Sequence, residues 1–237
     1  MTAVQQTARA QAVGQPASLL RIRRVGGALA LIIAPWGFVI TNATYAWMIR
    51  NGGSDSTGAE ALALAAAGPD VVRLAIVAGM LGCLLLIPAV LTALSLARGS
   101  RLAFVGGSMM IAGYVCYFGV LLSNTMIIAM AERGGPLADY AALIDADQQD
   151  PSTGWVFGIF IIGNLLGTLL FAIGLLRSRT VPAWAAILIM LWPPLHVVGL
   201  IIGGEVLEVI GALLQAIGFA GVAAVVLRRS RQEVSVG

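Results

Sequence analysis

The chain has 237 residues, of which 59% are hydrophobic and 11% are charged, and its formal net charge is +3. Soluble domains are typically about half apolar and about a quarter charged, so this composition excludes an ordinary soluble protein and predicts a membrane protein. The basic balance does not indicate nucleic-acid binding, because the arginines flank apolar segments and form no basic stripe. All fourteen basic residues are Arg, which we interpret as the coding bias of a GC-rich bacterial genome.

The chain begins with a polar segment, residues 1–20, that is rich in Ala and Gln. This segment lacks the apolar core of a signal peptide, so we expect a disordered cytoplasmic tail. A second, short cytoplasmic tail is expected over residues 232–237. The residues between these tails, 21–231, are expected to form one transmembrane domain.

Six apolar segments follow the first tail, and each is long enough to cross about 30 Å of hydrocarbon as a helix. Their approximate bounds are 25–49, 71–97, 102–131, 155–176, 181–203 and 206–227. A membrane β-barrel would show shorter segments of alternating polarity instead. The predicted fold class is therefore all-α, a polytopic transmembrane helical bundle with six spans.

The distribution of arginines predicts the orientation of the bundle. Ten of them lie within four residues of the first span (Arg21, Arg23 and Arg24), in the turns after the second and fourth spans, or directly after the sixth span. The opposite side has only Arg50, Arg73 and Arg133, together with eight acidic residues in two longer loops. Because short loops rich in Lys and Arg stay in the cytoplasm, both termini should be cytoplasmic. We expect a multi-pass protein of the plasma membrane, the inner membrane of a bacterium.

The two longer loops are each expected to contain a short helix. One is AEALALAAAGPD at 59–70, which ends in Gly-Pro, and the other lies within 134–151, between Gly-Gly-Pro and Asp-Pro. Both helices could lie on the outer membrane surface and cover the bundle.

Small residues and prolines predict how the spans pack. Glycines recur at intervals suited to close helix packing in three spans: Gly163 and Gly167, Gly199 and Gly203, and Gly211, Gly218 and Gly221. Prolines within the spans should kink or break their helices: Pro35, Pro88, Pro193 and Pro194.

Polar residues within the spans concentrate near the outer ends, where they could form a site. The candidate ligand-binding residues are Asn42, Arg73, Asn124, His196 and Glu208. An ionisable residue at mid-bilayer costs about 2.5–3.5 kcal/mol on insertion scales, so each needs a partner or a function. The functional hypothesis is an outward-facing pocket across which Arg73 pairs with Glu208. The alternative is that these groups only satisfy one another or extend to the interface.

His196 is the only histidine, which limits the chemistry of such a pocket. Bis-histidine haem ligation and a histidine-rich zinc site are excluded. A metal site made of Glu205, Glu208 and His196 is conceivable, but we expect neither a metal nor another cofactor.

The spacing of His196, Gly199 and Gly203 resembles the histidine motif of rhomboid intramembrane proteases. In that family a serine is the nucleophile and the histidine is its base. Ser108 is the nearest serine candidate, but it is expected near the cytoplasmic end of the third span, whereas His196 is near the outer end of the fifth. A general base must lie about 2.6–3.2 Å from its nucleophile, so we do not expect an enzyme.

The turn and helix entry RSRTVPAW, at 177–184, resembles a group of uncharacterised bacterial integral membrane proteins with six helices. In these proteins an Arg-rich cytoplasmic turn precedes a Pro-x-Trp sequence that opens the fifth helix. The first span, RRVGGALALI at 23–32, has a similar character. The resemblance implies the six-helix architecture and carries no catalytic residues.

These observations favour a non-enzymatic membrane protein that binds or handles a small molecule or lipid from the outer face. An accessory or substrate-capturing subunit of a larger membrane transport complex is the alternative, and an intramembrane enzyme is a remote one. The expected partners are membrane lipids, a small-molecule ligand, and either a second membrane protein or further copies of this chain.

Overall fold

The computed structural model describes residues 17–234, and these residues form helices and no strands. The helices are α2 (Ala17–Ile49), α3 (Gly58–Ala67), α4 (Pro69–Leu96), α5 (Arg101–Arg133), α6 (Leu137–Gln149), α7 (Pro151–Ile162), the π-helical turn η1 (Gly163–Gly167), α8 (Thr168–Ser178), α9 (Ala183–Ile202) and α10 (Glu205–Val234). The all-α fold class is thereby confirmed. Residues 1–16 and 235–237, which belong to the predicted tails, lie outside the described residues, whereas α2 already begins at Ala17.

Six helical segments in the described part of the chain are long and apolar enough to cross a membrane. They are 22–49, 69–96, 101–133, 151–178, 183–202 and 205–228, close to the six predicted spans. The fourth span is composite, because α7, η1 and α8 follow one another without a break. The protein is therefore a multi-pass helical membrane protein.

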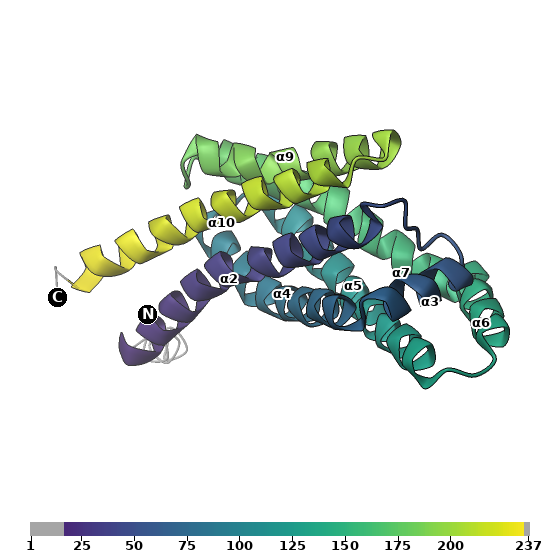
Figure 1. Ribbon diagram of the computed structural model, residues 1–237. Helices are drawn as coiled ribbons and strands as arrows, with labels where there is room; N and C mark the ends of the chain where they lie inside the picture. The colour runs from purple at the N-terminus through teal and green to yellow at the C-terminus, as the bar shows by residue number, and fades with distance from the viewer. Residues whose placement is uncertain (1–16, 235–237) are drawn as a thin grey trace, which may run out of the picture.

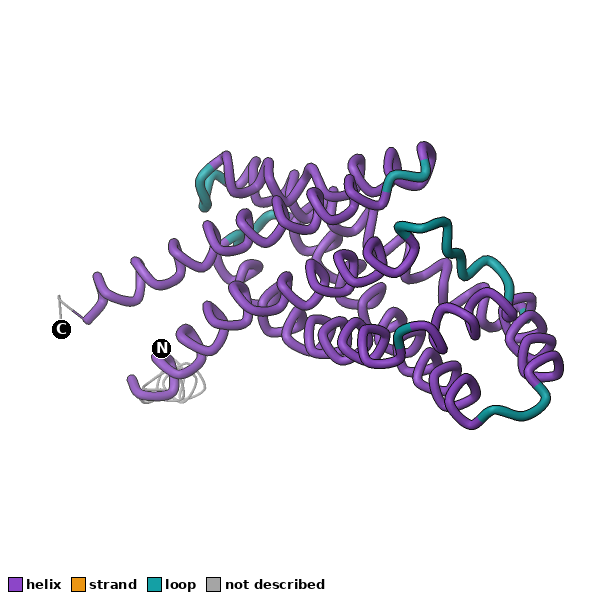
Figure 2. The backbone as a smooth tube through the Cα atoms, in the orientation of Figure 1, coloured by secondary structure: helices purple, strands orange, loops and turns teal. Residues whose placement is uncertain are grey.

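The six spans form a closed ring. Helix α2 packs between α4 and α10, α4 packs on α5, α5 packs on the fourth span, α8 packs on α9, and α9 packs on α10. Figures 1 and 2 show the start of α2 and the end of α10 at one end of the bundle and α3 and α6 at the other. We call these the arginine end and the loop end, because the turns 97–100 and 179–182, which contain Arg98 and Arg179, lie at the first.

The arginine end of the ring is filled by side chains. Phe171 of α8 and Phe219 of α10 are fully buried and stack at a centroid distance of 6.2 Å. Close backbone contact accompanies this packing: a Cβ on Gly106 of α5 would lie 2.2 Å from the backbone nitrogen of Phe171. A Cβ on Gly163 would lie 2.4 Å from the Met109 carbonyl oxygen, so the predicted role of the fourth-span glycines is confirmed. The bundle is thus closed at this end.

The structure corrects two expectations about helix packing. Gly203 does not pack between spans, because it ends α9 with a φ of +66°, a left-handed conformation that favours glycine. Of the two expected effects of the prolines, kinking or breaking, breaking is wrong, since α2, α4 and α9 run through them as continuous helices.

The loop end is covered by the two predicted short helices, which pack on each other and on α5. Thr57 and Glu60 form a capping box at the start of α3, and the Gly58 backbone N–H donates to Asp145 Oδ1 of α6 at 2.6 Å. Helix α5 has 33 residues, so it is about 50 Å long at 1.5 Å per residue and exceeds the thickness of the hydrocarbon core. Its final turns therefore support α3 and α6 beyond the packed part of the bundle.

Candidate functional site

A cavity of about 510 Å³ lies inside the ring near the loop end. All six spans contribute to its lining, and α3 and Asp55 of the loop after α2 complete it. The ring arrangement explains this, because each helix has one face toward a common interior. At the other end of the ring the same interior is occupied by the packed side chains around Phe171.

The fourth span shapes one side of the cavity. Helix α9 packs along α8 and touches η1, whereas α7 packs on α5 and α6 and buries none of its own residues. Phe157 of α7 and Leu200 of α9 both line the cavity, and both are exposed. Both α7 and α9 thus contribute exposed side chains to the lining of the cavity.

Aromatic rings form much of the wall. Tyr117 of α5 and Phe160 of α7 stack at 4.3 Å with an interplanar angle of 11°, and Phe38 of α2 lies 4.5 Å from Tyr114 of α5. Trp192 of α9 is buried and lies 4.9 Å from the His196 ring. These faces suit an apolar or aromatic ligand body.

Asn164 of η1 holds the base of this wall together. Its Oδ1 accepts hydrogen bonds from Tyr114 Oη at 2.7 Å and from Trp192 Nε1 at 3.0 Å, and the residue is 3% exposed. An indole N–H can only donate, which fixes the orientation of the amide. Three spans are therefore tied together at one buried amide.

The sequence analysis missed Asn164. Its signal was available, because it is a polar amide inside an apolar segment and should need a partner as much as Asn124 does. It lies deeper than the predicted outer residues and between two glycines that indicated packing only. Its partners Tyr114 and Trp192 were missed because they also lie deeper than the predicted outer residues.

His196 and Glu208 face each other across the hairpin of α9 and α10. His196 Nδ1 lies 2.9 Å from Glu208 Oε2. The hairpin turn is set by Gly203 and by a hydrogen bond from the Gly204 N–H to the Gly199 carbonyl at 2.9 Å. Gly199 leaves room for the carboxylate, since a Cβ there would lie 3.1 Å from Glu208 Cγ.

Glu208 is 5% exposed, and its Oε1 has no hydrogen-bond partner in the structure. A buried, unsatisfied carboxylate oxygen is costly unless something completes its bonding. Because Glu208 lines the cavity, the completing group can come from a molecule inside it.

Four of the five predicted site residues line this cavity: Asn42, Asn124, His196 and Glu208. The Asn42 Nδ2 donates to the Phe38 carbonyl at 2.9 Å, within its own helix. The structure therefore brings these four residues to one cavity, because their spans surround a common interior.

Arg73 does not line the cavity, and its expected pairing with Glu208 is wrong. Its guanidinium lies 3.1 Å from Asp70 one turn earlier in α4 and also pairs with Glu132 at the end of α5. The side chain is 46% exposed. Arg73 is in the first turns of α4, where a long side chain reaches the acidic ends of its own and the next helix more easily than the interior.

The cavity has an acidic balance. Its charged lining residues are Asp55 and Glu208, with His196 as the one histidine, and none of the described lining residues is Arg. Tyr45, which also lines the cavity, donates to Asp55 Oδ1 at 2.9 Å. The chain contains no Lys, so the lining holds no permanent positive charge.

The other conceivable chemistries are not supported by the placement of their residues. Within residues 17–234, no group of three His, Cys, Asp or Glu side chains could hold a metal ion. Ser108 is exposed on α5, whereas His196 lines the interior cavity. The serine and the histidine therefore do not form a catalytic pair.

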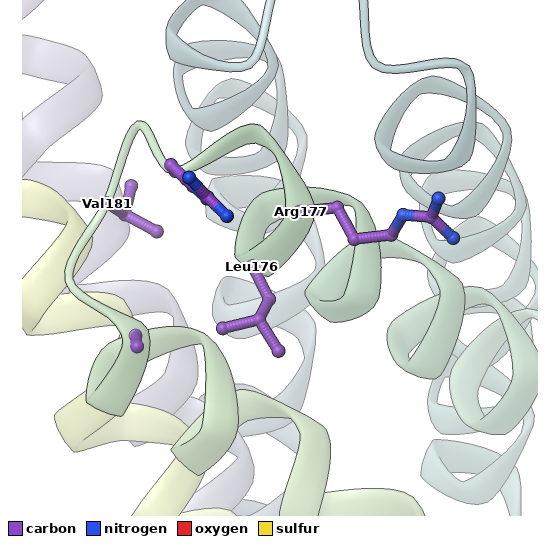
Figure 3. Close-up of a pocket in the computed structure, with 5 residues that line it drawn as sticks. Leu176, Arg177 and Val181 are labelled. Atoms are coloured by element: carbon purple, nitrogen blue, oxygen red, sulfur yellow. The ribbon is translucent and has the colours of Figure 1, made fainter.

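Two further hollows lie at the arginine end. One, of about 480 Å³, lies between α2 and α4 and is lined by Arg23, Arg24 and Arg98 among others. The second is an open groove at the turn between α8 and α9, where Arg177 extends away from Val181 (Figure 3). Their charge is opposite to that of the loop-end cavity, and neither has its aromatic wall.

The chain matches no protein-family profile, no curated protein and no solved structure. The function is therefore argued from the geometry of the cavity.

Proposed function

We propose that this protein binds a small amphiphilic molecule or lipid in the loop-end cavity and catalyses no reaction. The observation that carries the proposal is a 510 Å³ cavity with aromatic walls that contains a buried carboxyl group, Glu208, with one oxygen unpartnered. Apolar pockets of this size with a few converging polar groups are the usual form of small-molecule sites.

The arginine distribution supports an orientation with both termini in the cytoplasm of a bacterial cell and the cavity toward the outer face of the plasma membrane. In this orientation a ligand enters from the outer leaflet, between α7 and α9. Phe157 and Ile161 of α7 and Leu200 of α9, the exposed lining residues on these helices, form the sides of the entrance. The resemblance to bacterial six-helix proteins agrees with this location.

A second candidate function is that of a substrate-capturing subunit of a membrane complex. It is favoured by α7, which buries none of its residues and exposes 75% of Trp155. A partner helix against α7 would close the entrance or extend it.

The test is native mass spectrometry of the protein purified in mild detergent, using two variants of adjacent residues. Leu165 lines the cavity, whereas Leu166 is exposed and does not line it. Leu165→Trp should fill the cavity and abolish retention of a small molecule, while Leu166→Trp should retain it like the unmodified protein. Equal retention by both variants would contradict the proposal, and a second polypeptide bound to all three proteins would favour the complex subunit.

A further inference from the structure

We propose that the cavity selects an amphiphilic organic cation, with an ammonium group against Glu208 and an apolar body among the aromatic rings. This inference rests on the proposed binding function and adds the charge and class of the ligand.

The first argument is the charge of the lining. Asp55 and Glu208 line the cavity, and the described lining residues include no Arg. Arg73, the nearest predicted cation, is engaged by Asp70 and Glu132 outside the cavity. A carboxylate, phosphate or sulfate ligand would therefore meet acidic groups and no fixed positive charge, which disfavours its transfer from water.

The second argument is that several hydrogen-bond donors of the lining are already used by acceptors of the protein. Tyr114 and Trp192 donate to Asn164, Tyr45 donates to Asp55, Asn42 donates to a backbone carbonyl, and Thr41 Oγ1 bonds to the Gly37 and Ala75 carbonyls. Glu208 itself offers an acceptor: its Oε2 faces His196 Nδ1 at 2.9 Å, and its Oε1 is buried without a hydrogen-bond partner. A ligand that satisfies Oε1 supplies a donor, and an ammonium N–H is a charge-assisted one.

The third argument is the aromatic wall. The stacked pair of Tyr117 and Phe160, together with Phe38 and Trp192, offers ring faces within the same cavity. Ring faces attract organic cations and also pack against apolar bodies. A carboxylate beside aromatic rings, without a competing arginine, therefore favours a cation over a neutral molecule of the same shape.

The experiment uses three ligands with nearly the same body and different charge: 4-phenylbutylammonium, 4-phenylbutanol and 4-phenylbutyrate. Binding is measured by isothermal titration calorimetry on the full chain in lipid nanodiscs, with empty nanodiscs as the blank. The proteins are the unmodified chain, Glu208→Gln, and the matched control Glu205→Gln. Glu205 lies one turn earlier in α10 and does not line the cavity.

The ammonium should bind saturably and should weaken by at least about tenfold in Glu208→Gln, as expected for loss of a partly buried ion pair. Glu205→Gln should bind it like the unmodified chain. The alcohol should bind more weakly and equally to all three proteins, which also shows that the cavity is intact in Glu208→Gln. The butyrate should not bind.

The outcomes separate this inference from the proposed function. Equal affinities for the ammonium and the alcohol, no effect of Glu208→Gln, or preferential binding of the butyrate would overturn the cation inference and leave a binding cavity. Absence of binding by all three ligands would also overturn it, while the comparison of Leu165→Trp with Leu166→Trp would decide the proposed function separately. If Glu208→Gln also loses the alcohol, Asp55→Asn decides: it should weaken the ammonium alone, and an unchanged ammonium affinity would overturn the inference.

Discussion

The close contact between α5 and η1 can be tested with one methyl group. A Cβ on Gly163 would lie 2.4 Å from the Met109 carbonyl oxygen and 2.6 Å from Gly113 Cα. Ordinary van der Waals contact begins near 3.4 Å, so Gly163→Ala must move the two backbones apart by about 1 Å. Overpacking of this kind costs about 1–3 kcal/mol.

The cost should be greater than that of packing alone, because Asn164 follows directly in η1. Its hydrogen bonds to Tyr114 and Trp192, at 2.7 and 3.0 Å, would lengthen beyond the usual range if η1 moved away from α5. Weakening either bond adds about 0.5–1.5 kcal/mol. We therefore expect Gly163→Ala to lower the free energy of unfolding by about 2–4 kcal/mol.

Gly158→Ala is the matched control, since Gly158 lies in the same span and a Cβ there would meet nothing within 4 Å. It should change the free energy of unfolding by less than about 0.5 kcal/mol, or raise it slightly through helix propensity. The assay is equilibrium unfolding by sodium dodecyl sulfate in mixed micelles, followed by circular dichroism. If the two variants have the same free energy of unfolding, the close contact between α5 and η1 does not stabilise the fold, and the reasoning is refuted.

Three further predictions concern the site, the orientation and a helix cap. Asn164→Leu should cost about 1–3 kcal/mol for each buried donor left without its acceptor, measured by the same unfolding assay. In intact bacterial cells a membrane-impermeant maleimide should label Ser56→Cys and spare Thr180→Cys, with the unmodified chain as the blank; the reverse pattern would place the cavity toward the cytoplasm. Asp150 accepts from the Ser152 hydroxyl and backbone N–H, which lowers the pKa of its carboxyl below the ordinary 3.8. Its ionised form should therefore stabilise the fold above pH 3.8 and lose this effect as the pH falls through the lowered pKa, so the stability difference from Asp150→Asn, measured against pH, should shrink only in acid.

The spans and the two loop helices could be predicted because hydropathy and turn residues are properties of the linear sequence. The rotation of each helix about its axis is not, and it decides which polar residues meet. His196 and Glu208 were placed together correctly because a short turn joins their helices. The predicted pairing of Arg73 with Glu208 was wrong, because the depth of Arg73 in the membrane did not show that Glu132, at the end of α5, would lie closer.

The loop-end cavity exists because one span changes its packing partway along its length. In the fourth span, Gly163 and Gly167 of η1 and Gly174 of α8 would each place a Cβ within 3 Å of neighbouring backbone, whereas a Cβ on Gly154 or Gly158 of α7 would meet nothing within 4 Å. The π-helical turn η1 lies between these two halves. A π-turn adds one residue to the helical repeat, which rotates the following face by about 100° relative to a continuous α-helix. In α8 the span packs on α5 and α9, whereas α7 packs on α5 and α6 and lines the cavity with Phe157 and Phe160. Asn164 lies within the turn itself and ties it to α5 and α9 through Tyr114 and Trp192. The same five residues of η1 thus end the tight packing of the bundle and begin the binding cavity.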